Sequence, residues 1–167
     1  MITLYPDRTV IRVPETALFN LNPATAITIA VDTAYVASQQ GRNISQGIYM
    51  MDNMVGNGST GEGTLELHTK CRVGSLIGFN TVPINGEGVS GDQVIITGFT
   101  VSKGNVFTAA GQPRKQPSPN KEPDGSYWIG QAFNTGTETY QIQIKVTVGQ
   151  LQPVSYHINW DPFITAQ

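Results

Sequence analysis

The chain has 167 residues, of which 39% are hydrophobic and only 13% are charged, and its formal net charge is −2. This length is typical of one domain with one core, whereas the charged fraction is about half of the ~25% usual in globular proteins. The ten basic residues are dispersed, so no basic stripe is available to neutralise a nucleic-acid backbone. We therefore expect a single domain over residues 1–167 that binds no nucleic acid.

The first residues lack the pattern of a signal peptide or a membrane helix. Charges at Asp7, Arg8, Arg12 and Glu15 interrupt each apolar run, so the apolar region of roughly 7–15 residues that a signal peptide needs cannot be placed. No run of about 18 apolar residues follows that could cross a membrane as a helix. We expect a cytoplasmic protein without a membrane partner, in which residues 1–25 form an N-terminal extension that adds an edge strand.

Alternation of apolar and polar residues begins early in the chain and predicts β-strands. The first two candidates are TVIRV at 9–13 and AITIAV at 26–31. After them, DTAYVASQQ at 32–40 is the one segment with a helical pattern. Asp32 is its expected N-cap, because a side-chain oxygen there accepts from the free amides of the first turn, and Gly41 follows its end.

The clearest alternation lies in TLELHTKCRV, TYQIQIKVTV and PVSYHINW, at 64–73, 139–148 and 153–160. Each segment places its apolar residues on one face, as strands with one buried and one solvated side do. The predicted inward residues are Leu65, Leu67, Thr69, Cys71 and Val73; Tyr140, Ile142, Ile144, Val146 and Val148; and Val154, Tyr156, Ile158 and Trp160. Further strand candidates are LIGFNTV, QVIITGFTV and YWIGQAF at 76–82, 93–101 and 127–133.

These segments predict an all-β fold class. About eight strands separated by Gly, Pro and Asn, with at most one short helix, favour a two-layer antiparallel β-sandwich of jelly-roll or immunoglobulin-like type. A closed barrel is the alternative. The segment GQPRKQPSPNKEPDG at 111–125 has four prolines and no apolar residue, so it predicts a long mobile loop that buries nothing. Its basic residues Arg114, Lys115 and Lys121 leave a second interpretation open, a partner-docking element.

The glycines in VGNGSTGEG have the spacing of a nucleotide-binding loop, because Gly56, Gly58 and Gly61 stand as G-x-G-x-x-G. Such a loop needs a following helix whose first amides meet the phosphates. The residues after Gly63 instead alternate with period two and predict a strand, and no Lys-Ser/Thr pair follows the glycines. We therefore predict no nucleotide site and interpret the glycines as residues that allow positive φ in a loop or bulge.

No catalytic or metal-binding set is evident. Cys71 is the only cysteine and occupies a strand position, which indicates a buried structural thiol. His68 and His157 fall on outward faces of predicted strands, so we interpret both as polar surface residues rather than bases or ligands. The spacings H-x-H, H-E-x-x-H and C-x-x-C are absent, and the carboxylates are dispersed. We predict a protein that is not an enzyme, with no catalytic residue, metal or cofactor.

Aromatic residues are the remaining candidates for binding. Tyr127 and Trp128 are neighbours on a predicted strand, so one ring points into the core and the other points away, where it could stack on a sugar or a partner. Tyr49 begins the cluster YMMDNM at 49–54, whose methionines either fill the core or form an adaptable contact surface. These three aromatic residues and Asp32 are the candidate binding residues.

The C-terminal string WDPFI, formed by Trp160, Asp161, Pro162, Phe163 and Ile164, resembles the ending of the AidA/PixA inclusion-body family of bacterial proteins. Three further segments are similar to that family in the same order: IAVDTAYV, GEGTLELHTKCRVGSLIGF and YWIGQAFNTGTETYQIQIKV, at 29–36, 61–79 and 127–146. The resemblance therefore spans most of the chain, whereas the first 25 residues depart from the family pattern. The resemblance implies a bacterial protein under quorum-sensing control that accumulates in intracellular inclusions, without a known enzymatic activity or cofactor.

We interpret the WDPFI string as a structural clasp. In this interpretation Trp160 and Phe163 fill the end of the sandwich, Pro162 stops a strand and Asp161 caps backbone amides. Two functions remain. The first is a self-associating structural, storage or host-interaction protein that forms a homo-oligomer, because low charge and open sheet edges favour association. The alternative is a lectin-like or small-ligand module that binds a carbohydrate or a host-derived ligand with the glycine loop, the proline-rich loop and Trp128.

Overall fold

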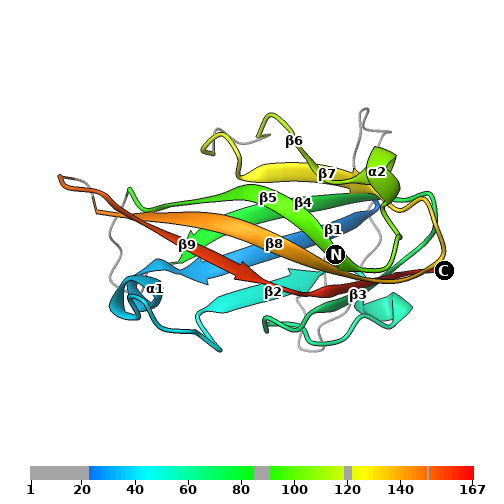
Figure 1. Cartoon of the computed structure of the whole chain (residues 1–167), viewed down its shortest axis with the longest axis horizontal. Helices are drawn as coiled ribbons and strands as arrows, with labels where there is room; N and C mark the ends of the chain where they lie inside the picture. Colours follow the sequence, from blue (N-terminus) through cyan, green and yellow to red (C-terminus); the bar gives the residue numbers. More distant parts are fainter. Residues whose placement is uncertain (1–22, 85–90, 119–121, 150) are drawn as a thin grey trace, which may run out of the picture.

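The computed structural model describes residues 23–84, 91–118, 122–149 and 151–167, which form two β-sheets packed face to face with short helices at the periphery (Figure 1). The predicted all-β sandwich is confirmed, since the described strands form two separate sheets rather than a closed barrel. The predicted strand at 9–13, and with it most of the N-terminal extension, lies outside the described residues.

In the part of the chain that the structure describes, sheet A has five strands in the order β2-β1-β4-β7-β6. Their bounds are Ile48–Asp52 for β2, Thr25–Asp32 for β1, Leu76–Ile84 for β4, Tyr127–Gln131 for β7 and Arg114–Lys115 for β6. β1 lies between β2 and β4, and its Ala30 is opposite Tyr49 on one side and Val82 on the other. This register determines which side chains meet on the outer face of the sheet.

Sheet B has the strand order β3-β10-β8-β5, and β9 pairs with β8. The bounds are His68–Cys71 for β3, Phe163–Ala166 for β10, Gly136–Val148 for β8, Gln93–Lys103 for β5 and Val154–Trp160 for β9. β8 is the longest strand and is the centre of the sheet, with β5 on one side and both β9 and β10 on the other.

The expectation of purely antiparallel sheets is wrong for two pairings. β1 runs parallel to β4, and β3 runs parallel to β10. Alternation reports which face of a strand is buried, but it does not report the direction of the neighbouring strand. Because the chain passes from β2 in sheet A to β3 in sheet B before it returns, β4 starts at the same end of sheet A as β1.

The described residues form two short α-helices, where the sequence predicts at most one. α1 (Thr33–Ser38) is the predicted helix, and its N-cap Asp32 accepts a hydrogen bond from the amide of Tyr35 at 2.9 Å. α2 (Thr108–Gly111) is a single turn without a side-chain cap, so the sequence gives no start signal for it. A 3₁₀ turn, η1 (Val55–Asn57), forms the beginning of the glycine loop at 55–63.

Several predicted strands have different bounds in the structure. The strand expected at 64–73 is reduced to β3, although Leu67, Thr69 and Cys71 are buried as predicted; Val73 lies beyond the strand and is 44% exposed. β2 and β10 were not predicted. The residues of β2 are apolar on both faces, with Tyr49 and Met51 outward, so their polarity does not alternate.

The C-terminal strands form one long arm along β8. β9 faces β8 from Val148↔Val154 to Ile142↔Trp160, and β10 continues from Thr139↔Phe163 without a change of register. The amide of Tyr140 donates to the carbonyl of Pro162 at 3.2 Å, but a proline cannot donate in return. Pro162 therefore separates β9, which ends at Trp160 in agreement with the predicted strand stop, from β10, which continues the arm from Phe163.

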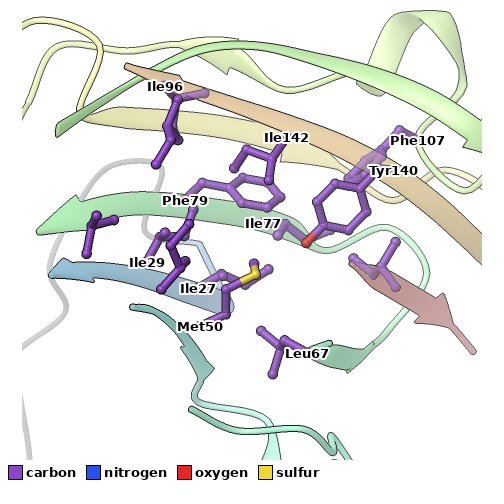
Figure 2. Packing of buried hydrophobic residues seen from close by; sticks show 14 of the residues in the cluster. Ile27, Ile29, Met50, Leu67, Ile77, Phe79, Ile96, Phe107, Tyr140 and Ile142 are labelled. Atoms are coloured by element: carbon purple, nitrogen blue, oxygen red, sulfur yellow. The ribbon is translucent and has the colours of Figure 1, made fainter. Parts of the chain in front are cut away.

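Aromatic rings from both sheets meet in the centre of the core (Figure 2). Phe79 of β4 is fully buried, and its ring centroid lies 4.8 Å from that of Phe99 on β5 and 5.8 Å from that of Tyr140 on β8. Phe107, which precedes α2, contacts the same Tyr140 ring edge-on at 6.0 Å. Burial of this cluster joins the two sheets, because apolar area removed from water contributes about 25 cal/mol per Å².

The proline-rich segment at 111–125 is partly structured in its described residues. β6 lies inside it and pairs with β7, and Lys115 forms an ion pair with Asp124 at 2.6 Å. Pro113 and Gly125 are buried, so the expectation that this segment buries nothing is wrong at its two ends. The buried ends lie against neighbouring strands, which composition alone does not reveal.

Candidate functional site

β2 of sheet A and β9 of sheet B lie along the same edge of the sandwich. Half of this edge is closed by hydrogen bonds between the chain that follows β2 and the neighbouring strands. There, the amide of Met50 donates to the carbonyl of Thr64, and Thr60 exchanges two backbone hydrogen bonds with His68 of β3. The indole N–H of Trp160 on β9 lies 3.1 Å from the sulfur of Met50 on β2 and marks the end of this closure. Beyond it, toward α1, β9 has β8 as its only partner among the described strands.

The other half of this edge is open and holds a groove of about 560 Å³. One wall is β9, and the other is the end of α1 with the chain that follows it; Figure 1 shows both at the same end of the sandwich. The volume lies in the range of ligand-binding pockets, which is about 300–1,000 Å³. The lining residues are Val36, Gln39, Gln40, Gly41, Arg42, Asn43, Ile44, Ser155, Tyr156, His157, Ile158 and Asn159.

The groove is polar and almost uncharged. Among the described residues that line it, Arg42 is the only one with a permanent charge, and amide side chains of Gln and Asn make up much of the rest. The side chain of Gln40 donates to the hydroxyl of Tyr156 at 3.4 Å, which connects the two walls. A smaller hollow of about 190 Å³ adjoins it and extends over Thr97 and Gln143 on the outer face of sheet B. These groups suit a neutral polar ligand or one with a single negative charge.

A second surface lies on the outer face of sheet A, and we call it the outer patch: Ala30, Tyr49, Met51, Val82 and Ile84. Tyr49, Ala30 and Val82 stand in one row across three strands. The four large side chains are between 37% and 44% exposed. Contiguous exposed apolar side chains of this kind usually mark an interaction surface.

The two predicted aromatic neighbours on β7 point to opposite faces, as expected. Trp128 packs against the core, with its ring 5.5 Å from that of Phe99 and its N–H bonded to the carbonyl of Gly125. Tyr127 lies on the outer face of sheet A and is half-buried, and the edge of its ring lies beside Gly78, which Pro23 also approaches. Burial raises the pKa of the Tyr127 hydroxyl. Neither ring lines the groove.

The other two candidate binding residues lie in different places. Asp32 is half-buried and serves as the cap of α1, so it supports one wall of the groove without lining it. Tyr49 belongs to the outer patch. The methionines near it are divided between the two predicted roles, since Met50 is fully buried and Met51 is 41% exposed.

The WDPFI residues differ in their environments. Trp160 is half-buried against the core, and Phe163 lies with its ring 5.8 Å from that of His68. Asp161 is exposed and accepts from the hydroxyl of Ser102 at 3.4 Å, rather than from backbone amides as expected. A strand arm continues past it, so the amides nearby are engaged in sheet pairing.

The glycine loop has the conformation expected of it, because Gly58, Gly61 and Gly63 have positive φ. A Cβ on Gly61 would lie 2.5 Å from the carbonyl oxygen of Glu66, so this glycine also permits a close backbone approach. The loop leads into β3 and not into a helix. Its role is to close half of the sandwich edge.

Three further titratable groups with shifted pKa values, Cys71, Glu138 and His68, neither line the groove nor belong to the outer patch. Burial, and then the charge of Asp52, raise the pKa of the Cys71 thiol to about 11, so it is a protonated structural thiol as predicted. Burial also raises the pKa of Glu138, whose carboxylate accepts from the amide of Phe107 at 3.0 Å. His68, expected on the surface, is half-buried against Thr165 at 2.7 Å, and burial lowers its pKa.

The described residues contain no group of three His, Cys, Asp or Glu side chains arranged to hold a metal ion. Within the same residues, no helix has both the length and the apolar character needed to cross a membrane. Sequence reasoning missed the groove, because its walls come from segments more than 100 residues apart. The exposed edge of β9 carried one signal in the sequence: Ser155, His157 and Asn159 alternate outward with no charged residue among them.

The comparisons with known proteins agree with this architecture. A family model described as a domain of unknown function, DUF8788, matches residues 24–152, which is more than half of the chain. The chain belongs to the DUF8788 family. No curated protein matches the sequence of this DUF8788 protein.

A solved structure places the DUF8788 chain in a known fold. The crystal structure of the inclusion body protein PixA from Burkholderia cenocepacia J2315 matches with a TM-score of 0.67 over 92% of this chain and 100% of that chain, at 16% sequence identity. The resemblance predicted from the WDPFI string and its companion segments is thereby confirmed at the level of the fold. The match spans both sheets, so the PixA-like β-sandwich is the scaffold on which the groove and the outer patch lie.

Proposed function

We propose that this chain is a non-enzymatic, cytoplasmic protein of the inclusion-body type that self-associates through the outer patch. The observation that carries the proposal is the row Tyr49, Ala30 and Val82, extended by Met51 and Ile84, on a sheet face without a described layer above it. The name of PixA, an inclusion body protein with the same fold, supports the same assignment. A second copy of the chain is the partner.

The physical basis is burial of apolar area with little charge repulsion. A net charge of −2 on 167 residues gives weak electrostatic repulsion between copies. The outer patch contains no charged side chain, so two patches can meet without desolvating an ion. The rigid β-strands beneath it hold the side chains in fixed positions, which lowers the entropy that association costs.

The non-enzymatic part of the proposal is supported by the environment of the reactive groups. The Cys71 thiol is buried with a raised pKa, which suppresses the thiolate that nucleophilic chemistry needs. Among its described lining residues, the groove holds Arg42 and one histidine, His157, but no carboxylate that could orient or activate that imidazole.

Light scattering on the purified protein over a wide concentration range tests this proposal. The mean mass is expected to rise with concentration. Methionine oxidation gives the location: Met51 in the outer patch is expected to react more slowly as the protein assembles, while the adjacent Met50, which is fully buried, stays slow throughout. A monomer at every concentration, with constant Met51 reactivity, would contradict the proposal.

A second candidate function is a ligand-binding module, and the groove is the observation that favours it. Its amide side chains and the Tyr156 ring match the chemistry of neutral polar ligands, saccharides among them. Titration with a saccharide panel, followed by NMR, is expected to shift signals of residues 39–44 and 155–159. Shifts elsewhere, or none with any ligand class, would count against this function.

A further inference from the structure

We infer that the groove accepts an extended peptide segment of a partner protein, which adds to the free edge of β9 as a further strand of sheet B. This inference rests on the second candidate function, the groove as a binding site, and names its ligand class. The occupant is a peptide with alternating apolar and polar side chains and one carboxylate.

β9 is the least protected sheet edge among the described strands. Proteins guard open edges with charges, prolines, bulges or short strands. β5 has two register shifts and carries Lys103, and β6 consists of only Arg114 and Lys115. The outer edge of β2 already pairs with the loop at Gly63 and Thr64. By contrast, Val154–Trp160 runs in unbroken register with no Asp, Glu, Lys, Arg or Pro.

In an antiparallel pair, alternate residues of a strand bond to the neighbouring strand. On β9, the residues whose N–H and C=O groups do not bond to β8 are among those that line the groove. The bond from Tyr140 to Pro162 fixes which pairs of the arm are hydrogen-bonded, and every second residue from Pro162 back to Val154 shares that phase. The N–H and C=O groups of Ser155, His157 and Asn159 therefore point away from β8. All three residues line the groove. Phe163 follows the same phase in β10, where its amide donates to Leu67 beside β3.

The pairing of β3 with β10 shows that a strand fits beside the arm formed by β9 and β10. β3 pairs with β10 over four residues, and the described chain leaves the continuation of that row next to β9 without a strand. A peptide beside Ser155–Asn159 would occupy the position in sheet B that continues the line of β3. The Trp160 contact with Met50 limits it at one end.

The groove also determines the side chains that such a peptide needs. Inward residues of an added strand would meet Val36, Ile44 and Ile158, which favours apolar residues at alternate positions. Outward residues would stand beside Ser155, His157 and Asn159, which favours polar neutral ones. Arg42 is the one permanent charge in the lining, so a carboxylate on the peptide provides the complementary charge.

An array of seven-residue peptides that alternate Val, Ile or Leu with Thr or Ser, each with one Glu, is the probe. The variants His157→Pro and His157→Thr are the matched pair, since both remove the imidazole and only proline removes the N–H that points into the groove. The ladder with β8 does not use that N–H, and proline is tolerated at such edge positions. We expect His157→Pro to weaken binding about tenfold relative to His157→Thr, as loss of a backbone bond predicts. Arg42→Gln should weaken only peptides that contain Glu.

Amide hydrogen exchange of the wild-type protein gives a readout that does not depend on variants. The amides of Ser155, His157 and Asn159 are expected to exchange fast when free and to become protected with peptide, while those of Tyr156 and Ile158 are protected in both states. Equal binding by the two His157 variants, or no new protection, would overturn the inference. Binding of saccharides without peptides would overturn it and leave the groove function standing. Binding of neither class would remove both.

Discussion

The outer patch of sheet A and the groove beside β9 differ in chemistry although they belong to one sandwich. Strands of both sheets point apolar residues inward, with Ile27, Ile29 and Phe79 in sheet A and Ile142 and Ile144 in sheet B. Their outward residues differ: Tyr, Met, Val and Ile form the patch, whereas Gln, Asn, Ser and His surround the groove. The inward pattern determines the fold, and the outward pattern determines what each surface can bind.

The largest effect is expected from Phe79→Ala, because this side chain joins the two sheets that carry the two surfaces. Loss of its ring contacts with Phe99 and Tyr140 should lower the free energy of unfolding by about 3–5 kcal/mol. Chemical denaturation measures this, with Phe133→Ala, 45% exposed, as the control that changes stability by less than about 1 kcal/mol. Two separate unfolding transitions, one for sheet A with the outer patch and one for sheet B with the β9 wall of the groove, would show that the sheets do not form one cooperative unit.

A smaller effect is expected in the glycine loop, which closes half of the sandwich edge. Gly61→Ala should cost more than about 2 kcal/mol, because a Cβ at positive φ would also meet the Glu66 carbonyl oxygen at 2.5 Å. Gly63→Ala is the matched control: its φ is also positive, but nothing lies within 4 Å, so it should cost about 1–2 kcal/mol. Equal losses in urea unfolding would show that the close approach at Gly61 contributes nothing to the closure.

The smallest effect is a pH dependence of the free energy of unfolding, which comes from Glu138. Burial raises the pKa of Glu138 above its ordinary value of 4.5, so the folded state binds more protons than the unfolded one. Its contribution to stability is therefore present at low pH and is lost as the pH rises through the raised pKa. Relative to Glu138→Gln, the wild-type protein should lose unfolding free energy on going from acidic to neutral pH. A parallel pH profile for the two proteins would refute this assignment.

The fold was largely predictable because alternation survives in strands with one solvated face. The helix at Asp32 was predictable for the same local reason, since a cap and its partner amide lie within one turn. Strand direction was not predictable, because β1 is parallel to β4 through a connection that alternation does not encode. Tyr49 was predicted as a candidate binding residue, whereas Val82 lies in the same row only through the register of two strand pairs.

The groove was beyond sequence reasoning for a further reason. Arg42 and His157 meet there because α1 turns the chain back toward β9, and no local pattern links the two positions. Trp128 was a reasonable binding candidate by composition, but its indole is used in the core against Phe99. Burial of a ring depends on which face of the strand it occupies, and adjacent aromatic residues leave that choice open.

The central claim is that copies of this chain associate through the outer patch, and one pair of variants tests it most directly. Val82 in the patch and Val101 on β5 of the other sheet are 37% and 40% exposed, so the same change to lysine alters the same side chain at nearly the same exposure. Light scattering at high concentration should show Val82→Lys as a monomer and Val101→Lys assembled like the wild-type protein. Assembly of Val82→Lys at the wild-type level, or loss of assembly in both variants, would contradict the account.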